Sequence, residues 1–254
     1  MDYPAAQISA SAIERPAPLL ELRELRGGTS ATKEEEADGL KFKAIRQEGL
    51  RVGAQAGLST RYGQIMKYLE ARQTDLDVTF GFARFVRDGR MLIPAVVETP
   101  NQFKLDPQTG KATEIKNAIT VGDEARIVSV VPTWRDYLWQ EYAYPDPPHP
   151  SLLPSTPAEV KAWQDAVDAG WKAGYAQADG IFDDRVNRLA MAVEGRSLYI
   201  TLEQQKVFTP AALRVVSNKV TFNGRTMNIG ETIYAIGDQA NYTNSRNWRP
   251  TWSK

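Results

Sequence analysis

The stretch TPAEVKAWQDAVDAGWKAGYAQADGIFDDRVNRLAMAVEG, residues 156–195, decides the fold. It opens with a capping box, in which Thr156 is the N-cap, Pro157 is the first helical residue and Glu159 reaches back to the cap. Apolar residues then follow at helical spacing, namely Val160, Trp163, Val167, Trp171, Tyr175, Ala178, Phe182, Val186, Leu189 and Val193. Gly195 is typical of the residue after a helix C-terminus. The sequence therefore predicts one long helix over residues 156–195.

A second helix is predicted over residues 34–71, whose later part carries apolar side chains at three- and four-residue spacing. Its first half is rich in glycine, and each glycine inside a helix costs about 1 kcal/mol relative to alanine. That half is therefore either not helical or packed closely against another backbone. Glycines with four-residue spacing occur in both predicted helices, at Gly49, Gly53, Gly57, Gly170 and Gly174. We expect the two helices to pack against each other at these glycines.

Two further regions are predicted to form strands. Residues 90–131 are rich in β-branched residues and contain a turn signal at 106–111, and residues 198–236 contain the hairpin dipeptide Asn223-Gly224. Residues 76–87 fit either a strand or a continuation of the helical part. We therefore expect an α+β fold. It has a helical N-terminal part and one long central helix packed on a mainly antiparallel sheet, to which both strand regions contribute.

Three segments are expected along the chain. Residues 1–36 contain prolines, a Gly-Gly pair and a charged run, which together indicate a flexible leader or docking segment. Leucines at positions 19–25 cluster inside it, which favours a short docked helix, with disorder as the alternative. Residues 37–240 are expected to form a single α+β domain, and residues 241–254 a polar C-terminal tail.

Residues 132–154 combine aromatic residues with prolines, a composition that predicts an extended strap. A proline-stiffened segment loses little entropy on docking, and Trp and Tyr are frequent in binding hot spots. Trp134 and Trp139 are expected to pack on the body, whereas Tyr142 and Tyr144 are expected to meet a neighbouring subunit. A clasp within the chain is the alternative. The partner-binding candidates are Trp134, Tyr137, Trp139, Tyr142 and Tyr144.

The composition argues against several classes of partner and of catalytic or metal site. The 31 basic side chains balance the 31 acidic ones, which argues against a nucleic-acid partner. Cysteine is absent and His149 is the single histidine, so thiol catalysis, disulfides and a two-histidine metal site are excluded. Asp183 and Asp184 point about 100° apart on a helix and do not form a catalytic pair. We therefore expect no enzyme activity, no cofactor and no metal.

No run of 18 apolar residues occurs, so no transmembrane helix is expected, and no signal peptide is visible. Several strings, in a specific order over roughly residues 40–240, are nevertheless similar to one family. They are GAQAGL at 53–58, LIPAVV at 92–97, PTWRDYL at 132–138, SLLP at 151–154, GWKAG at 170–174 and QADGIF at 177–182. In these strings the chain resembles the DotC family.

The resemblance implies a structural role. DotC-like proteins are outer-membrane lipoproteins of type IVB secretion systems, which include Dot/Icm systems and those of IncI-type conjugative plasmids. They help to build the core complex with DotD-like and DotH-like partners. The family's anchor is an acylated cysteine, which this sequence lacks. An anchor, and a position at the periplasmic face of the outer membrane, are therefore expected of the parent protein. The alternative functions are a periplasmic peptide- or ligand-binding module and, less readily, a cell-wall hydrolase.

Overall fold

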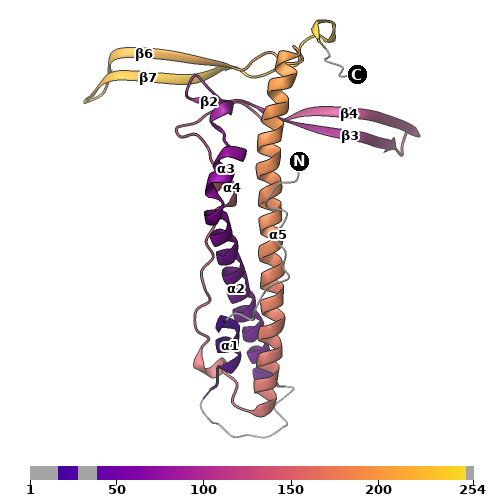
Figure 1. Ribbon diagram of the computed structural model, residues 1–254, viewed down its shortest axis with the longest axis vertical. Coiled ribbons are helices and arrows are strands. Elements are labelled where there is room, and N and C mark those ends of the chain that lie inside the picture. The colour runs from indigo at the N-terminus through magenta and orange to yellow at the C-terminus, as the bar shows by residue number, and fades with distance from the viewer. Residues whose placement is uncertain (1–16, 28–38, 250–254) are drawn as a thin grey trace. The chain divides into compact units, whose positions relative to one another are not determined.

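The computed structural model describes residues 17–27 and 39–249, which combine helices with antiparallel strands (Figure 1). The helices are α1 Ala17–Glu24, α2 Leu40–Ala71, α3 Gln73–Thr79, α4 Trp134–Leu138 and α5 Pro157–Gln204. The strands are β1 Val86–Arg87, β2 Met91–Leu92, β3 Ala95–Asp106, β4 Lys111–Asp123, β5 Arg126–Ile127, β6 Ala212–Asn223 and β7 Thr226–Asp238. The predicted α+β class with one long central helix is confirmed.

The chain divides into two compact units. Unit 1 contains the described residues up to Asp75 together with Leu138–Val186, and unit 2 contains Leu76–Tyr137 and the described residues from Asn187 onward. Helix α5 supplies residues to both units. The predicted boundaries of leader, domain and tail stay a prediction, and most of the predicted leader lies outside the described residues.

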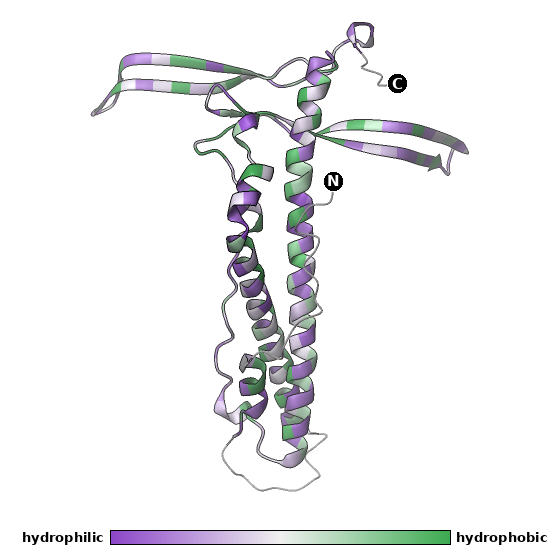
Figure 2. Cartoon of the chain, viewed as in Figure 1, coloured by the Kyte–Doolittle hydropathy of each residue, from purple (hydrophilic) through white to green (hydrophobic). Residues whose placement is uncertain are grey.

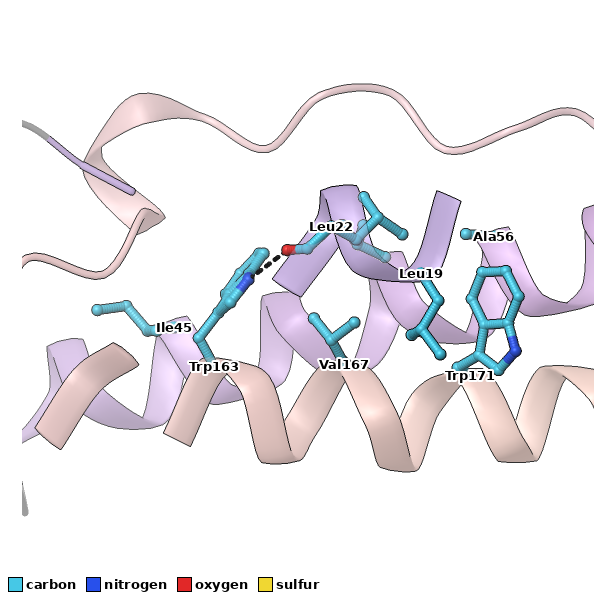
Figure 3. Close-up of a cluster of buried hydrophobic side chains, with 8 residues drawn as sticks. Leu19, Leu22, Ile45, Ala56, Trp163, Val167 and Trp171 are labelled. Carbon is cyan, nitrogen blue, oxygen red and sulfur yellow. Dashed lines mark hydrogen bonds between the residues drawn. The ribbon is translucent and has the colours of Figure 1, made fainter. Parts of the chain in front are cut away.

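Unit 1 has a core between α1, α2 and α5, shown in Figure 3. The Trp163 indole Nε1 donates a hydrogen bond of 2.9 Å to the Leu22 carbonyl oxygen, and the Gly27 amide donates one of 2.8 Å to the Pro154 carbonyl oxygen. The docked helix expected from the leucine cluster is thus present as α1. The buried side chains of this core are Leu19, Leu22, Ile45, Val52, Ala56, Trp163, Val167 and Trp171.

The predicted glycines lie where α2 and α5 touch. A Cβ at Gly53 would overlap the Val167 carbonyl oxygen, and a Cβ at Gly174 would overlap that of Ala54. The absence of a side chain is therefore what lets the two backbones approach so closely. Helix α2 is continuous from Leu40, which settles the question about its first half in favour of a helix. The glycines that face the other helix are Gly49, Gly53, Gly57, Gly170 and Gly174.

The N-terminus of α5 is the capping box that the sequence predicts. The Glu159 carboxylate accepts hydrogen bonds from the backbone amides of Ser155 and Thr156, at 2.8 and 3.1 Å, and from the Ser155 hydroxyl at 2.9 Å. In return the Glu159 amide donates to the Thr156 hydroxyl at 3.2 Å. The Lys41 ammonium lies 3.2 Å from the same carboxylate, so α2 also contributes to the cap.

This cap predicts a pH-dependent stability. Burial alone would raise the pKa of Glu159, but hydrogen bonds from Ser155 and Thr156 and the Lys41 ammonium lower it to about 2. Because the pKa is lower in the folded chain, the contribution is complete above the unfolded value of about 4.3 and is lost as the pH falls towards 2. Glu159→Gln should lower the free energy of unfolding by about 2 kcal/mol at pH 7. Urea unfolding at several pH values should show this difference shrink below pH 4, and a constant difference would contradict it.

The predicted end of α5 at Gly195 is wrong. Gly195 keeps a helical conformation and is not among the glycines with positive φ. A Cβ there would lie 2.6 Å from the Val96 carbonyl oxygen, so this glycine makes room for strand β3. The reason for the residue is therefore close packing and not helix termination.

Helix α5 ends nine residues later, at Gln204, in a Schellman motif. Lys206 takes the left-handed conformation, with φ +60°. The Val207 amide donates to the Leu202 carbonyl at 2.8 Å, and the Lys206 amide donates to the Glu203 carbonyl at 2.9 Å. The predicted strand region 198–236 is corrected accordingly, because its first residues extend α5 and its first strand begins at Ala212.

In unit 2 the antiparallel strands form three separate sheets and not one shared sheet. Strand β2 lies between β1 and β5, while β3–β4 and β6–β7 are hairpins. The Asn223-Gly224 hairpin is confirmed, with Gly224 at φ +58°. Residues 76–87 are mostly helical, since α3 runs to Thr79 and a 3-10 turn follows at Ala83–Phe85. A small core of Met91, Ala125 and Ala211 packs against Leu213 and Ile236 at the base of the β6–β7 hairpin.

Candidate interaction surfaces

The strap is divided between the two units, and its first part is packed in unit 2. Trp134 is buried in α4, and its Nε1 donates a hydrogen bond of 2.7 Å to the Asp77 carboxylate. The Tyr137 ring stacks on Phe82 with 5.5 Å between centroids. These two candidates therefore have partners inside their own unit, and neither is a free aromatic surface.

The second part of the strap runs in extended conformation along α2 in unit 1. The Tyr142 ring meets Tyr62 edge-on at 5.0 Å, and the Tyr142 carbonyl accepts a hydrogen bond of 2.8 Å from Ser59. Burial raises the pKa of Tyr62, so its hydroxyl stays protonated and donates to the Leu138 carbonyl at 3.0 Å. Tyr142 is thus part of the packing and not a freely exposed side chain.

Trp139 and Tyr144 are the exposed candidates. Their side chains are 37% and 47% exposed, although the sequence predicts that Trp139 packs on the body. Of the five strap aromatics, these two present the most surface for a partner. The periodicity of the sequence does not indicate which strap aromatics are exposed, because Tyr62 and Phe82, which contact the rings of Tyr142 and Tyr137, lie on elements that are distant in the sequence.

Unit 2 contains a cleft of about 660 Å³ beside the β3–β4 hairpin. Arg196 of α5 lines it and is fully buried, donating to the Ala192 carbonyl at 2.8 Å and to the Asp123 carboxylate. Its Nε is the one buried side-chain nitrogen or oxygen without a hydrogen-bond partner in the described part of the chain. Arg126 and Arg188 also line the cleft. The cleft is lined by cationic and apolar groups, and the ion pair between Arg196 and Asp123 forms part of its wall.

The β6–β7 hairpin carries an apolar face that sequence reasoning missed. Side chains alternate between the faces of a strand, and the register places Val216 opposite Ile233, Val220 opposite Ile229 and Phe222 opposite Met227 on one face. All of them are 47–76% exposed. The signal that could have found this face is the alternation Val216, Asn218, Val220, Phe222 after the predicted hairpin was placed. The opposite face is mostly polar, with Ser217, Lys219 and Thr221.

Residues 17–27 and 39–249 contain no group of three or more His, Asp or Glu side chains that could hold a metal ion. His149 is exposed, and its Nδ1 lies 2.7 Å from the Ser151 hydroxyl at the start of a 3-10 turn. Hydrophilic residues recur along α2 and α5 in Figure 2, and no helix in the described ranges is long and apolar enough to cross a membrane.

Among the described residues, the exposed strap aromatics and the apolar face of the β6–β7 hairpin are the candidate contact surfaces. A model of a family described as type IV secretory system, conjugal DNA-protein transfer, matches residues 39–250. The match covers most of the chain, so the chain belongs to this type IV secretion family. No curated protein matches the sequence.

Proposed function

We propose that this protein is a non-enzymatic structural subunit of a type IVB secretion or conjugative-transfer machine, equivalent to DotC. In that role it helps to place and hold partner subunits in the core complex at the periplasmic face of the outer membrane. The observation that carries the proposal is the family match over residues 39–250. The exposed aromatic side chains of the strap support it, because surfaces of this kind serve protein contacts.

The partners proposed for this subunit are DotD-like and DotH-like proteins of the same machine. The test is a pull-down of the full-length chain against these subunits, together with deletion of its gene. We expect capture of at least one of the subunits and loss of DNA transfer or effector export in the deletion strain. Export at the wild-type level without the gene, or capture of no core subunit, would contradict the proposal.

The contact surface itself is tested by Trp139→Ala combined with Tyr144→Ala. Both side chains are exposed and neither is part of a buried core, so the melting temperature should stay within about 2 °C of wild type. Capture of the partner should fall about tenfold or more, because truncation of an aromatic hot spot typically costs at least 2 kcal/mol.

The matched control for the strap is Phe103→Ala. Phe103 is an aromatic residue of β3 that is 68% exposed and lies outside the strap. This variant should bind the partner as wild type does. Equal losses of partner binding in the control and in the strap variant would contradict a specific role of the strap. Unchanged binding in the strap variant would favour the alternative, in which the strap is a clasp within the chain.

A further inference from the structure

No element within residues 17–27 and 39–249 covers the apolar face of the β6–β7 hairpin. At the base of the hairpin, Leu213 and Ile236 of the opposite face pack on the core of unit 2. The apolar face therefore points away from that core. A two-stranded hairpin is marginally stable by itself in water and gains stability when one face is covered. We propose that this face binds the same face of a second copy of this chain.

The exposed area of the face suits a dimer. The apolar face is made of Val216, Val220, Phe222, Met227, Ile229 and Ile233. From their fractional exposures these side chains present about 700 Å² to solvent, whereas the largest apolar patch of a typical monomer is about 300–600 Å². A standard interface buries about 800 Å² per partner, so the face approaches the area of a complete interface by itself.

The polar pair at the centre of the apolar face, Asn218 and Glu231, favours a second copy of this chain as the partner. Asn218 lies opposite Glu231 between the apolar pairs, and its Nδ2 donates a hydrogen bond of 3.2 Å to the Glu231 carboxylate. An amide nitrogen carries two hydrogens, so one donor remains for a second acceptor. A second copy supplies that acceptor as its own Glu231, and the two pairs then close a ring of hydrogen bonds.

The same pair fixes the orientation of the dimer. A two-fold axis parallel to the strands places β6 over β7 of the other copy, so that Asn218 meets Glu231, Val220 meets Ile229 and Phe222 meets Met227. A two-fold axis across the strands would place Glu231 over Glu231, and like charges repel. The hairpins therefore lie parallel, with the two tips at Arg225 side by side.

The interface is tested by a matched pair of substitutions in the full-length chain. Val216 and Val215 are neighbours with 52% and 51% exposure, and they lie on opposite faces. Sedimentation equilibrium from about 1 to about 100 μM should show a wild-type dimer. Val216→Thr should raise the dimer dissociation constant about tenfold or more, because the apolar contact is lost twice per dimer. Val215→Thr should leave it unchanged.

The triple variant Val216→Thr, Val220→Thr, Ile229→Thr should be monomeric and should keep the wild-type circular dichroism spectrum, while its melting temperature loses the contribution of dimerisation. Threonine retains the strand preference, so the hairpin is expected to survive. A wild-type chain that is monomeric over the whole concentration range would overturn the proposal. So would a dimer that the triple variant leaves intact, or one that Val215→Thr weakens as much as Val216→Thr does.

The orientation is tested by Arg225→Cys, which introduces a single thiol because the chain has no cysteine. In parallel hairpins the two thiols are near each other, since packed sheets lie about 10 Å apart, and a short bismaleimide should join two chains. In the other orientation the tips are about 30 Å or more apart and no joined product forms. Dimerisation is measured with the purified chain alone, so its outcome does not depend on the proposed secretion role.

Discussion

Gly174→Leu is expected to prevent unit 1 from folding. A Cβ at this position would overlap the Ala54 carbonyl oxygen and lie 2.8 Å from the Leu58 amide nitrogen. Both are backbone atoms of α2, so no side-chain movement relieves the clash, and the helices must separate. Overpacking in a core costs about 1–3 kcal/mol even when side chains can adjust. We expect Gly174→Ala to cost about 3 kcal/mol, and the leucine variant to yield no cooperative unfolding transition by circular dichroism in urea.

The control for this prediction is a glycine in the same helix with open space around it. A Cβ at Gly180 would meet nothing within 4 Å. Gly180→Ala should therefore raise the free energy of unfolding by about 0.5–1 kcal/mol, because alanine is the better helix former. The two alanine variants are thus expected to change stability in opposite directions. A stable Gly174→Ala chain would show that the α2–α5 contact is looser than described.

Asp123→Ala should be the second most damaging change, costing about 3 kcal/mol. The carboxylate of Asp123 pairs with the fully buried guanidinium of Arg196, which also donates a hydrogen bond to the Ala192 carbonyl. Without Asp123, a buried positive charge loses its counter-ion, and the cost of that is about 3–5 kcal/mol for a fully buried pair. The value expected here is at the lower end because Asp123 is 41% exposed. Thermal and urea unfolding of the full chain measure it.

Replacement of the arginine of the same ion pair should have only a small effect on stability. Arg196→Met removes the buried charge and leaves Asp123 with access to water, so its cost should stay within about 1 kcal/mol. Asp184→Ala, an exposed carboxylate of the same helix, is a neutral control. A methionine variant that is less stable than Asp123→Ala would mean that the arginine itself, through its place against the Phe82 ring at 5.8 Å, holds the cleft together.

Local patterns predicted the helices and the hairpin better than they predicted their ends and faces. The capping box located the start of α5, because a helix N-terminus is satisfied by residues next to it in the sequence. The predicted end of α5 is wrong because the left-handed residue that ends the helix is Lys206, at a position where glycine is usual. Gly195 is instead required by its close packing against a strand that is distant in the sequence. Which strap aromatics are exposed also depends on distant residues, such as Tyr62 for Tyr142.

The contact between α2 and α5 has a consequence for how the protein is made. The two helices touch only after the whole of residues 72–156 has been synthesised, so their contact is a non-local one. Before that, α2 carries interior glycines without the partner that offsets their cost, and isolated helices are marginal in water. The glycine-lined side of α2 is therefore exposed to solvent during synthesis. Unit 1 is expected to fold slowly, because its folding rate is limited by the closure of a long loop.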